Sequence, residues 1–543
     1  MSACEVSPEQ AEVKLVESLP GFSELADSLS NASIKVAKWA NNNGSLVYSK
    51  PQTVDWKKEL ESLRKINVNH QRYRGSYTVQ DSTIGQERIV RFRANEPDQE
   101  VKKMEIHLNK GRIVYYAVEK SRKSIFSSSH LWFEFTPTTY RLSFDQKINF
   151  VFSNHQEIYA TLIHNGDLWR ASLNLNDHET PIQFIIDDSY MGLTVINGEE
   201  RIGFNQTTQH EDTTIFASDH FDSEFKLVFS SDSTLEGVWI SRKTEEIKVI
   251  TLKASKGVPY RFEVDDLPNF NLQGDHKMVF YDYDGNPQPP VLLRLNQAQH
   301  IVTGTILTKT GDYRYLDGAI RNDSLFLSTL DGTHSYLFTA SIGDGVLDGH
   351  YYFGGEKGKR WTATLNDAVD LPDPNSLTHN TKDQAIDFSF INSQKEMVGL
   401  QEFKGQPTLI SVMGTWCSNC MDEAVFLKEA HELYAPKGLE IIALDFELVA
   451  DSARALQNIK RHVSSMELPY PVLLAGVKST KRMAQETLPW LDEVISYPTL
   501  ITLDRNHNVV SIHTGFSGPA TGRETYNAFR KEYFALLDSL TQE

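Results

Sequence analysis

The sequence predicts a multidomain protein in which a mostly antiparallel β region is followed by a C-terminal α/β domain. Its 543 residues are enough for roughly three to four domains of ordinary size. Short segments of alternating apolar and polar residues continue to about residue 365, whereas later strands are continuously apolar and alternate with helices. Residues 367–383, between these regions, are polar and aperiodic and contain two prolines, which is typical of an interdomain linker.

The composition argues against nucleic-acid binding and against a membrane-spanning helix. The chain has 54 Lys and Arg against 72 Asp and Glu, a formal net charge of -18 that repels phosphate backbones. Since no basic segment stands apart, we expect no nucleic-acid binding. No apolar run approaches the roughly 18 residues that a membrane-spanning helix needs.

The N-terminal segment, residues 1–40, begins with "MSACEVSPEQ". Its first four residues are similar to the end of a bacterial lipoprotein signal whose basic and apolar parts are missing. Cys4 is therefore a lipidation candidate and would supply a lipid anchor to a membrane. The alternative is an ordinary cysteine in a cytoplasmic protein, if Met1 is the true start.

Residues 41–160 are expected to form a helix followed by an antiparallel β domain. In residues 53–65, Trp56, Leu60 and Leu63 recur at helical spacing with charges between them, which predicts an amphipathic helix. The later stretch "KKMEIHLNKGRIVYYAVEKS" alternates on both sides of Asn109-Lys110-Gly111. This pattern predicts a β-hairpin.

Two further β modules are expected, at residues 161–272 and 273–366. The pattern Gly-Asp at residue 166 recurs at residue 274, and "LEGVWI" from Leu235 recurs loosely as "LDGHYY" from Leu347. Both offsets are about 110 residues, which suggests a duplication. Chance matches of Gly and Asp in turns explain the same pattern, so the duplication remains a hypothesis at this level.

Residues 384–543 show the pattern of an α/β domain in which helices cover both faces of a sheet. We expect "PTLISVMG" and "LEIIALDF" to be buried strands, with a helix between them that ends at Pro436 and Gly438. "YPTLITLD" and "NVVSIHTGF" form a hairpin turned by residues 504–508, and a last helix starts near Arg523.

Cys417 and Cys420 lie in "GTWCSNCMDE", where the first of these strands gives way to the helix. Free N–H groups and the positive end of the helix dipole favour a thiolate there. We therefore expect Cys417 to be an exposed nucleophile and Cys420, one turn later, to resolve its mixed disulfides. A structural zinc site lacks ligands: no further cysteine follows, and the histidines at 431, 462, 507 and 513 show no paired spacing. We expect no metal, and a purely structural disulfide would close too small a loop to stabilise much.

The segment "FKGQPTLISVMGTWCSNCMDE", followed about 80 residues later by "SYPTLITLD", resembles the TlpA/ResA-like thiol-disulfide oxidoreductases, which have a thioredoxin fold. The resemblance covers residues 384–543. Looser stretches such as "TGTILTKTGDYRYLDG" are similar to multidomain envelope proteins of Bacteroidetes-type bacteria with a β-rich N-terminal region. That likeness gives the N-terminal region no activity, but it favours Cys4 as a lipidation site.

The resemblance implies roles for three residues around the pair. Pro498 matches the proline that has a cis peptide bond opposite the cysteines in such folds; a trans proline at a strand start is the alternative. Tyr497 would then offer its backbone to an extended substrate. Trp416 would line the substrate surface, or else pack in the core.

Thioredoxins have a buried Asp beneath the cysteines, and this position holds Ser411, which cannot act as a base. The resemblance implies a Glu near the end of the second strand instead, for which Glu447 is the candidate and Asp445 the rival. Asp422 and Glu423 are expected in the first turn of the helix, where they would stabilise it and slightly oppose the thiolate.

These inferences together predict a protein-disulfide reductase in the cell envelope, with disulfide-containing proteins as substrates, an upstream reductase as partner and no cofactor beyond the cysteine pair. The β region would serve as a spacer or as a docking platform. A second hypothesis is an envelope binding or scaffold protein with an ancillary redox domain. A peroxiredoxin-type peroxidase is a third, although its Pro-x-x-x-Thr/Ser-x-x-Cys pattern is absent here. The cluster in residues 210–222 could bind a cation, but a solvated hairpin explains it better.

Overall fold

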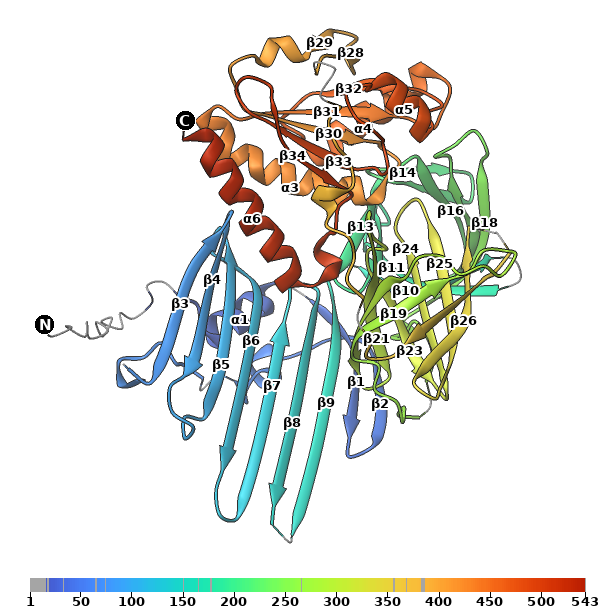
Figure 1. Cartoon of the computed structure of the whole chain (residues 1–543). Coiled ribbons are helices and arrows are strands. Elements are labelled where there is room, and N and C mark those ends of the chain that lie inside the picture. The colour runs from blue at the N-terminus through green and yellow to red at the C-terminus, as the bar shows by residue number, and fades with distance from the viewer. Residues whose placement is uncertain are drawn as a thin grey trace, which may run out of the picture. The chain divides into compact units, whose positions relative to one another are not determined.

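The computed structural model describes residues 16, 19–32, 34–63, 66–73, 75–149, 151–164, 166–175, 178–264, 266–354, 357–367, 369–381 and 386–542. The chain divides into two compact units, residues 1–165 and residues 166–543 (Figure 1). Each unit is described by itself. Among the residues given above, no helix is both long and apolar enough to cross a membrane.

The first unit is a nine-stranded antiparallel sheet in the order β2-β1-β9-β8-β7-β6-β5-β4-β3. Strands β3 to β9 follow one another as successive hairpins, because each sequence neighbour is also a spatial neighbour. The strands are β1 (Lys35–Asn42), β2 (Ser45–Thr53), β3 (Tyr77–Ile84), β4 (Glu87–Ala94), β5 (Val101–Asn109), β6 (Arg112–Lys123), β7 (Ser127–Phe135), β8 (Thr139–Ile148) and β9 (Phe152–Ile163). The expected hairpin at residues 109–111 is confirmed as the β5–β6 turn.

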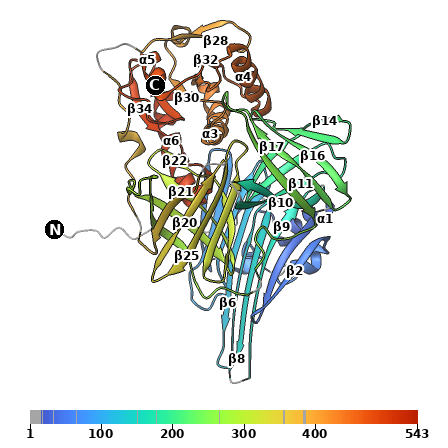
Figure 2. The same ribbon diagram turned by 90° about the vertical axis from the view of Figure 1, so that its right-hand side faces the viewer.

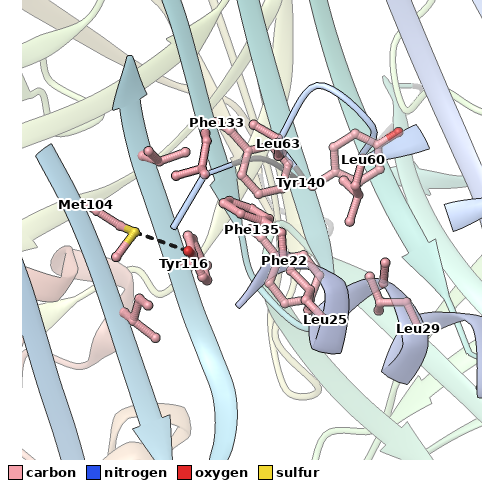
Figure 3. Packing of buried hydrophobic residues seen from close by; sticks show 14 of the residues in the cluster. Phe22, Leu25, Leu29, Leu60, Leu63, Met104, Tyr116, Phe133, Phe135 and Tyr140 are labelled. Carbon is pink, nitrogen blue, oxygen red and sulfur yellow. Dashed lines mark hydrogen bonds between the residues drawn. The ribbon is translucent and has the colours of Figure 1, made fainter. Parts of the chain in front are cut away.

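Helix α1 (Phe22–Asn31) lies against one face of this sheet, as Figure 3 shows. Phe22 at the start of the helix packs its ring 4.3 Å from that of Tyr116 on β6, and Leu25 and Leu29 lie on the same face. The Tyr116 hydroxyl is buried with Met104 Sδ as its acceptor, at 3.2 Å. The core of the unit therefore lies between α1 and the sheet.

The amphipathic helix expected over residues 53–65 is much shorter in the structure. Helix α2 covers only Trp56–Glu59 and is followed by turns. Trp56, Leu60 and Leu63 are nevertheless all buried, at most 2% exposed. The apolar spacing thus predicted the buried face correctly, whereas the length of the helix was wrong because successive turns place the same side chains on the core.

The second unit begins with two nine-stranded antiparallel sheets (Figure 2). The second sheet of the chain has the order β13-β12-β11-β10-β18-β17-β16-β15-β14. The third sheet has the order β20-β19-β27-β26-β25-β24-β23-β21-β22, with β20 also paired to β21. The strands are β10 (Asp167–Leu175), β11 (His178–Ile186), β12 (Leu193–Asn197), β13 (Glu200–Phe204), β14 (Gln206–His210), β15 (Thr213–Ala217), β16 (Ser223–Ser231), β17 (Thr234–Ser241), β18 (Lys248–Lys256), β19 (Gly274–Phe280), β20 (Val291–Ala298), β21 (Ile301–Thr308), β22 (Gly311–Asp312), β23 (Leu316–Arg321), β24 (Ser324–Leu330), β25 (Ser335–Gly343), β26 (Val346–Phe353) and β27 (Lys359–Thr364).

The two sheets place the suspected repeat at equivalent positions. In each, the first strand (β10 or β19) pairs with the last (β18 or β27), and the last pairs with the strand before it. Leu235 lies on β17 and Leu347 on β26, the penultimate strand of its sheet in both cases. The matching topology favours duplication over chance similarity of turn residues.

The C-terminal sheet is mixed, in the order β29-β28-β32-β31-β30-β33-β34, with β30, β31 and β32 parallel. Helices α3 and α6 pack side by side, and the Tyr434 hydroxyl donates to the carbonyl oxygen of Phe534 at 3.0 Å. The expected strands, hairpin and last helix are confirmed. The elements are β28 (Ser389–Asn392), β29 (Met397–Gly399), β30 (Thr408–Met413), α3 (Ser418–Tyr434), β31 (Glu440–Phe446), α4 (Ser452–Met466), β32 (Val472–Gly476), α5 (Lys481–Thr487), β33 (Thr499–Leu503), β34 (Val509–Thr514) and α6 (Arg523–Thr541).

The sheets refine the expected domain boundaries. Those after residues 40 and 160 fall inside β1 and β9, which pair with each other, so the first unit starts earlier and ends later than expected. The expected linker is also attached to the C-terminal sheet. Within it, the Thr378 hydroxyl accepts a hydrogen bond from Thr514 at 2.8 Å, and Asn380 forms a β-bridge with Leu491.

Candidate active site

Cys417 is the N-cap residue of α3, four residues after the end of β30. The backbone N–H of Cys420 donates to Cys417 Sγ at 3.2 Å, and the two cysteines form a disulfide with Cα atoms 5.3 Å apart. The strand end fixes Cys417 and the first helical turn brings Cys420 beneath it. This is the arrangement that the spacing predicts, with an N–H group directed at the sulfur.

The expectation of an exposed sulfur is wrong for this state of the protein. Cys417 is 7% exposed and Cys420 is 2% exposed. The carbonyl oxygen of Tyr497 lies 3.5 Å from Cys417 Sγ, and the two residues between the cysteines are contacted by a segment of the third sheet. Chain segments on both sides of the pair therefore exclude solvent from it.

The segment opposite the cysteines contains the one cis peptide bond of the described chain, between Tyr497 and Pro498. The Tyr497 ring packs edge-on against Trp416, with centroids 5.6 Å apart. The indole N–H of Trp416 donates to the carbonyl oxygen of Phe446 at 2.9 Å. Trp416 is only partly buried, so it both packs on its neighbours and contributes to the surface beside the pair.

Two carboxylates near the end of β31 contact Thr415, two residues before Cys417. Asp445 Oδ1 accepts the Thr415 N–H at 3.0 Å, and Glu447 accepts the Thr415 hydroxyl. Asn458 also donates to Glu447, at 3.3 Å. Burial raises the pKa of Glu447; burial and the neighbouring Glu447 raise the pKa of Asp445. Both candidates named from the sequence are thus buried carboxyl groups next to the approach to Cys417.

Glu423 is a third buried carboxyl group, and sequence reasoning missed it. It is 1% exposed, and burial raises its pKa to about 8. Its Oε2 accepts the hydroxyl of Ser411, and its Oε1 has no hydrogen-bond partner in the part of the chain that is described. Ser411 occupies the place expected of a buried Asp, and the carboxyl group of Glu423 reaches it from α3.

The sequence contained a signal for this placement. Cys420, Ala424 and Leu427 recur at i, i+4 and i+7 and are buried, and Glu423 falls at i+3 on the same face. The expectation that Asp422 and Glu423 lie in the first helical turn was wrong, because α3 begins at Ser418. They lie in the second turn, too far from the helix start to stabilise it by charge.

Asp422, on α3, faces the β region that precedes the C-terminal domain. Its Oδ1 lies 3.0 Å from a guanidinium nitrogen of Arg314, in the loop between β22 and β23. Burial raises the pKa of Asp422 to about 6, even though the positive charge of Arg314 opposes this change. Asp422 therefore links α3 to the β region.

The other candidates from the sequence do not join this site. His210 and Asp212 lie at an exposed hairpin turn, Asp222 pairs with Arg454 at 2.8 Å, and His220 contacts Ser465. Within the described ranges, no group of His, Cys, Asp or Glu residues is arranged to hold a metal ion. Cys4 lies outside the described residues.

The family comparison assigns this part of the chain. Residues 380–528 match the family model described as Redoxin. These residues are a redoxin domain. The expected resemblance to TlpA/ResA-like proteins is confirmed for this C-terminal region.

The redoxin domain is similar to two curated relatives named thiol-disulfide oxidoreductase ResA. The protein of Bacillus thuringiensis subsp. konkukian is 29% identical over 128 residues, which are 23% of this chain and 65% of that protein. The Bacillus anthracis protein is 31% identical over 91 residues, 17% of this chain and 49% of its own length. The chain therefore spans less than two thirds of the length of these two relatives.

Among solved structures, a thiol:disulfide interchange protein of the thioredoxin family from Chlorobium tepidum TLS is 17% identical. The match covers 30% of this chain and 97% of that chain, with a TM-score of 0.23.

Proposed function

We propose that this protein is a thiol-disulfide oxidoreductase of the cell envelope that reduces disulfides in other proteins. The observation that carries the proposal is the Cys417–Cys420 disulfide at the start of α3 in a redoxin domain, with the N–H of Cys420 directed at Cys417 Sγ. The envelope location is supported by the N-terminal pattern around Cys4 and by the family resemblance.

In the reduced enzyme, the Cys417 thiolate attacks one sulfur of a substrate disulfide. A Cys417–substrate disulfide forms, and the other substrate sulfur leaves as a thiolate. Cys420 then loses its proton and attacks Cys417 Sγ, which restores the observed intramolecular disulfide and releases the second substrate thiol. An external dithiol, supplied by an upstream reductase, returns two electrons to the pair.

In its ionised form, Glu423 would accept the proton of Cys420. It lies one turn after Cys420 on the same face of α3, and its pKa of about 8 permits proton exchange near neutral pH. Tyr497, Pro498 and Trp416 would form the surface that receives the polypeptide. Glu447 accepts the hydroxyl of Thr415, two residues before Cys417, and would hold this part of the chain in position.

The test is trapping of the mixed disulfide. Cys420→Ser should accumulate a covalent adduct with disulfide-containing substrate proteins, because no thiol remains to release it, whereas Cys417→Ser should trap nothing. Cys4→Ser is the matched control and should reduce insulin at the wild-type rate. Insulin reduction by Cys417→Ser at the wild-type rate would refute the proposal.

A further inference from the structure

A segment of the third sheet, residues 308–315, lies directly on the redox pair; we name it the cover segment. The side-chain amide of Asn419, between the two cysteines, donates to the carbonyl oxygen of Asp312 at 3.0 Å. Asp312 Oδ2 in turn accepts the N–H of Gly518 at 2.6 Å, and Gly311 forms a parallel β-bridge with Phe516. The cover segment therefore contacts both α3 and the loop after β34.

Arg314 joins the cover segment to the first turns of α3. One guanidinium nitrogen donates to the carbonyl oxygen of Ser418 at 2.9 Å, and the other lies 3.0 Å from Asp422 Oδ1. The same nitrogen is 2.7 Å from Glu200 Oε1, on β13 of the second sheet. Because the Arg314 side chain is only 6% exposed, this contact has little competition from water.

The fit is close on both sides of the pair. A Cβ atom at Gly311 would lie 2.4 Å from the amide nitrogen of Asn419, and one at Gly515 would lie 2.2 Å from the carbonyl oxygen of Thr310. The hydroxyl of Ser496, which precedes Tyr497, donates to that same Thr310 carbonyl at 3.3 Å. The backbone of the cover segment thus lies against the chain on both sides of Cys417.

We propose that the cover segment closes the active site and that it must move away before a protein disulfide can reach Cys417, with Arg314 as the latch. This inference rests on the proposed function for its substrate, an extended polypeptide. A disulfide must approach Cys417 Sγ directly, and Cys417 is only 7% exposed while the cover segment contacts both residues between the cysteines. Gly311 pairs with Phe516 as an added extended strand would, and Thr310 contacts Ser496, the residue before Tyr497, so the cover segment lies beside the surface proposed to receive the polypeptide.

The experiment measures alkylation of Cys417 by iodoacetamide in the reduced, full-length protein, read by mass spectrometry of the Cys417 peptide. Rates are compared at the alkaline plateau, where the thiol is fully ionised and a changed thiol pKa no longer alters the fraction of thiolate. Arg314→Ala should react roughly tenfold faster or more, because it leaves Glu200 and Asp422 without their buried partner. The control is Arg360→Ala, whose ion pair with Asp348 in the same sheet is 48% exposed on the arginine side; it should react at the wild-type rate.

A second variant decides the question if Arg314→Ala does not fold. Gly311→Ala places a methyl group against Asn419 and should also accelerate alkylation, whereas Gly343→Ala, with nothing within 4 Å of its Cβ position, should not. Wild-type alkylation rates in folded Gly311→Ala and Arg314→Ala proteins would overturn the cover. Insulin reduction, measured in parallel, tests the proposed function separately. Faster alkylation without insulin reduction would support the covering role of residues 308–315 and would refute the proposed reduction of protein disulfides.

Discussion

Replacement of Glu423 by Gln should make the redoxin domain more stable in alkaline solution. The pKa of Glu423 is raised from 4.5 to about 8 by burial, so the folded domain keeps its proton while the unfolded chain releases it above pH 4.5. Stability from this residue is therefore fully present below pH 4.5 and is lost as the pH rises towards 8. A glutamine side chain at this position stays neutral at every pH and avoids that loss.

The difference between a pKa of 4.5 in the unfolded chain and about 8 in the folded domain corresponds to a loss of roughly 5 kcal/mol in the free energy of unfolding, at 1.36 kcal/mol for each pH unit. Water that enters on ionisation recovers part of this cost, so we expect the Glu423→Gln domain to be about 3 to 5 kcal/mol more stable than wild type at pH 8.5. At pH 4.5 the two should agree to about 1 kcal/mol, because Gln can still accept the hydroxyl of Ser411.

The assay is urea unfolding at both pH values, followed by a pulse of hydrogen exchange and mass spectrometry of peptides from β30 and α3. These peptides report on the redoxin domain alone, so unfolding of the β sheets does not enter the measured free energy. The control is Glu486→Gln, whose ion pair with Arg482 is largely exposed and should change stability by less than about 0.5 kcal/mol at either pH. An equal difference between wild type and Glu423→Gln at both pH values would refute the assignment of a buried, protonated carboxyl group.

Two further substitutions test the packing of each half of the second unit. Gly349→Ala should destabilise the third sheet by about 1 to 3 kcal/mol, because its Cβ would lie 1.8 Å from the Thr339 carbonyl oxygen. Gly343→Ala, in the same sheet, has nothing within 4 Å of its Cβ position and should be nearly neutral. Pulsed hydrogen exchange of peptides from β25 and β26 measures both effects. Phe426→Ala should cost the redoxin domain about 3 to 5 kcal/mol in urea unfolding, since the ring is fully buried, whereas a comparable loss in Val425→Ala, which is 56% exposed, would contradict this explanation.

The sequence predicted the redoxin domain well because its signals are local. Continuous apolar strands, a helix that begins beside Cys417, and the hairpin turned at residues 504–508 each depend on neighbouring residues. The amphipathic spacing of Trp56, Leu60 and Leu63 was informative about burial but not about helix length. Turns can bury the same three side chains as a helix does, so the pattern alone could not distinguish them.

The environment of the cysteines was less predictable because it depends on residues far apart in the chain. Glu423 could have been assigned to the buried face of α3 from its spacing, but its link to Ser411 needs the packing of helix on strand. The contact of Asn419 with Asp312 joins residues 107 positions apart, and no local pattern announces it. The occlusion of Cys417 was missed for that reason.

These contacts change the role of the second and third sheets, which the sequence suggested as a spacer or docking platform. A spacer would leave the two residues between the cysteines free, since in a redox pair they influence the thiolate of the first cysteine. Here the carbonyl oxygen of Ser418 and the side chain of Asn419 are hydrogen-bonded to Arg314 and Asp312 of the cover segment. Arg314, which makes one of these bonds, is itself paired with Glu200 of the second sheet. If the cover segment moves as proposed, these hydrogen bonds of Ser418 and Asn419 break, which would couple the position of the third sheet to the reactivity of Cys417.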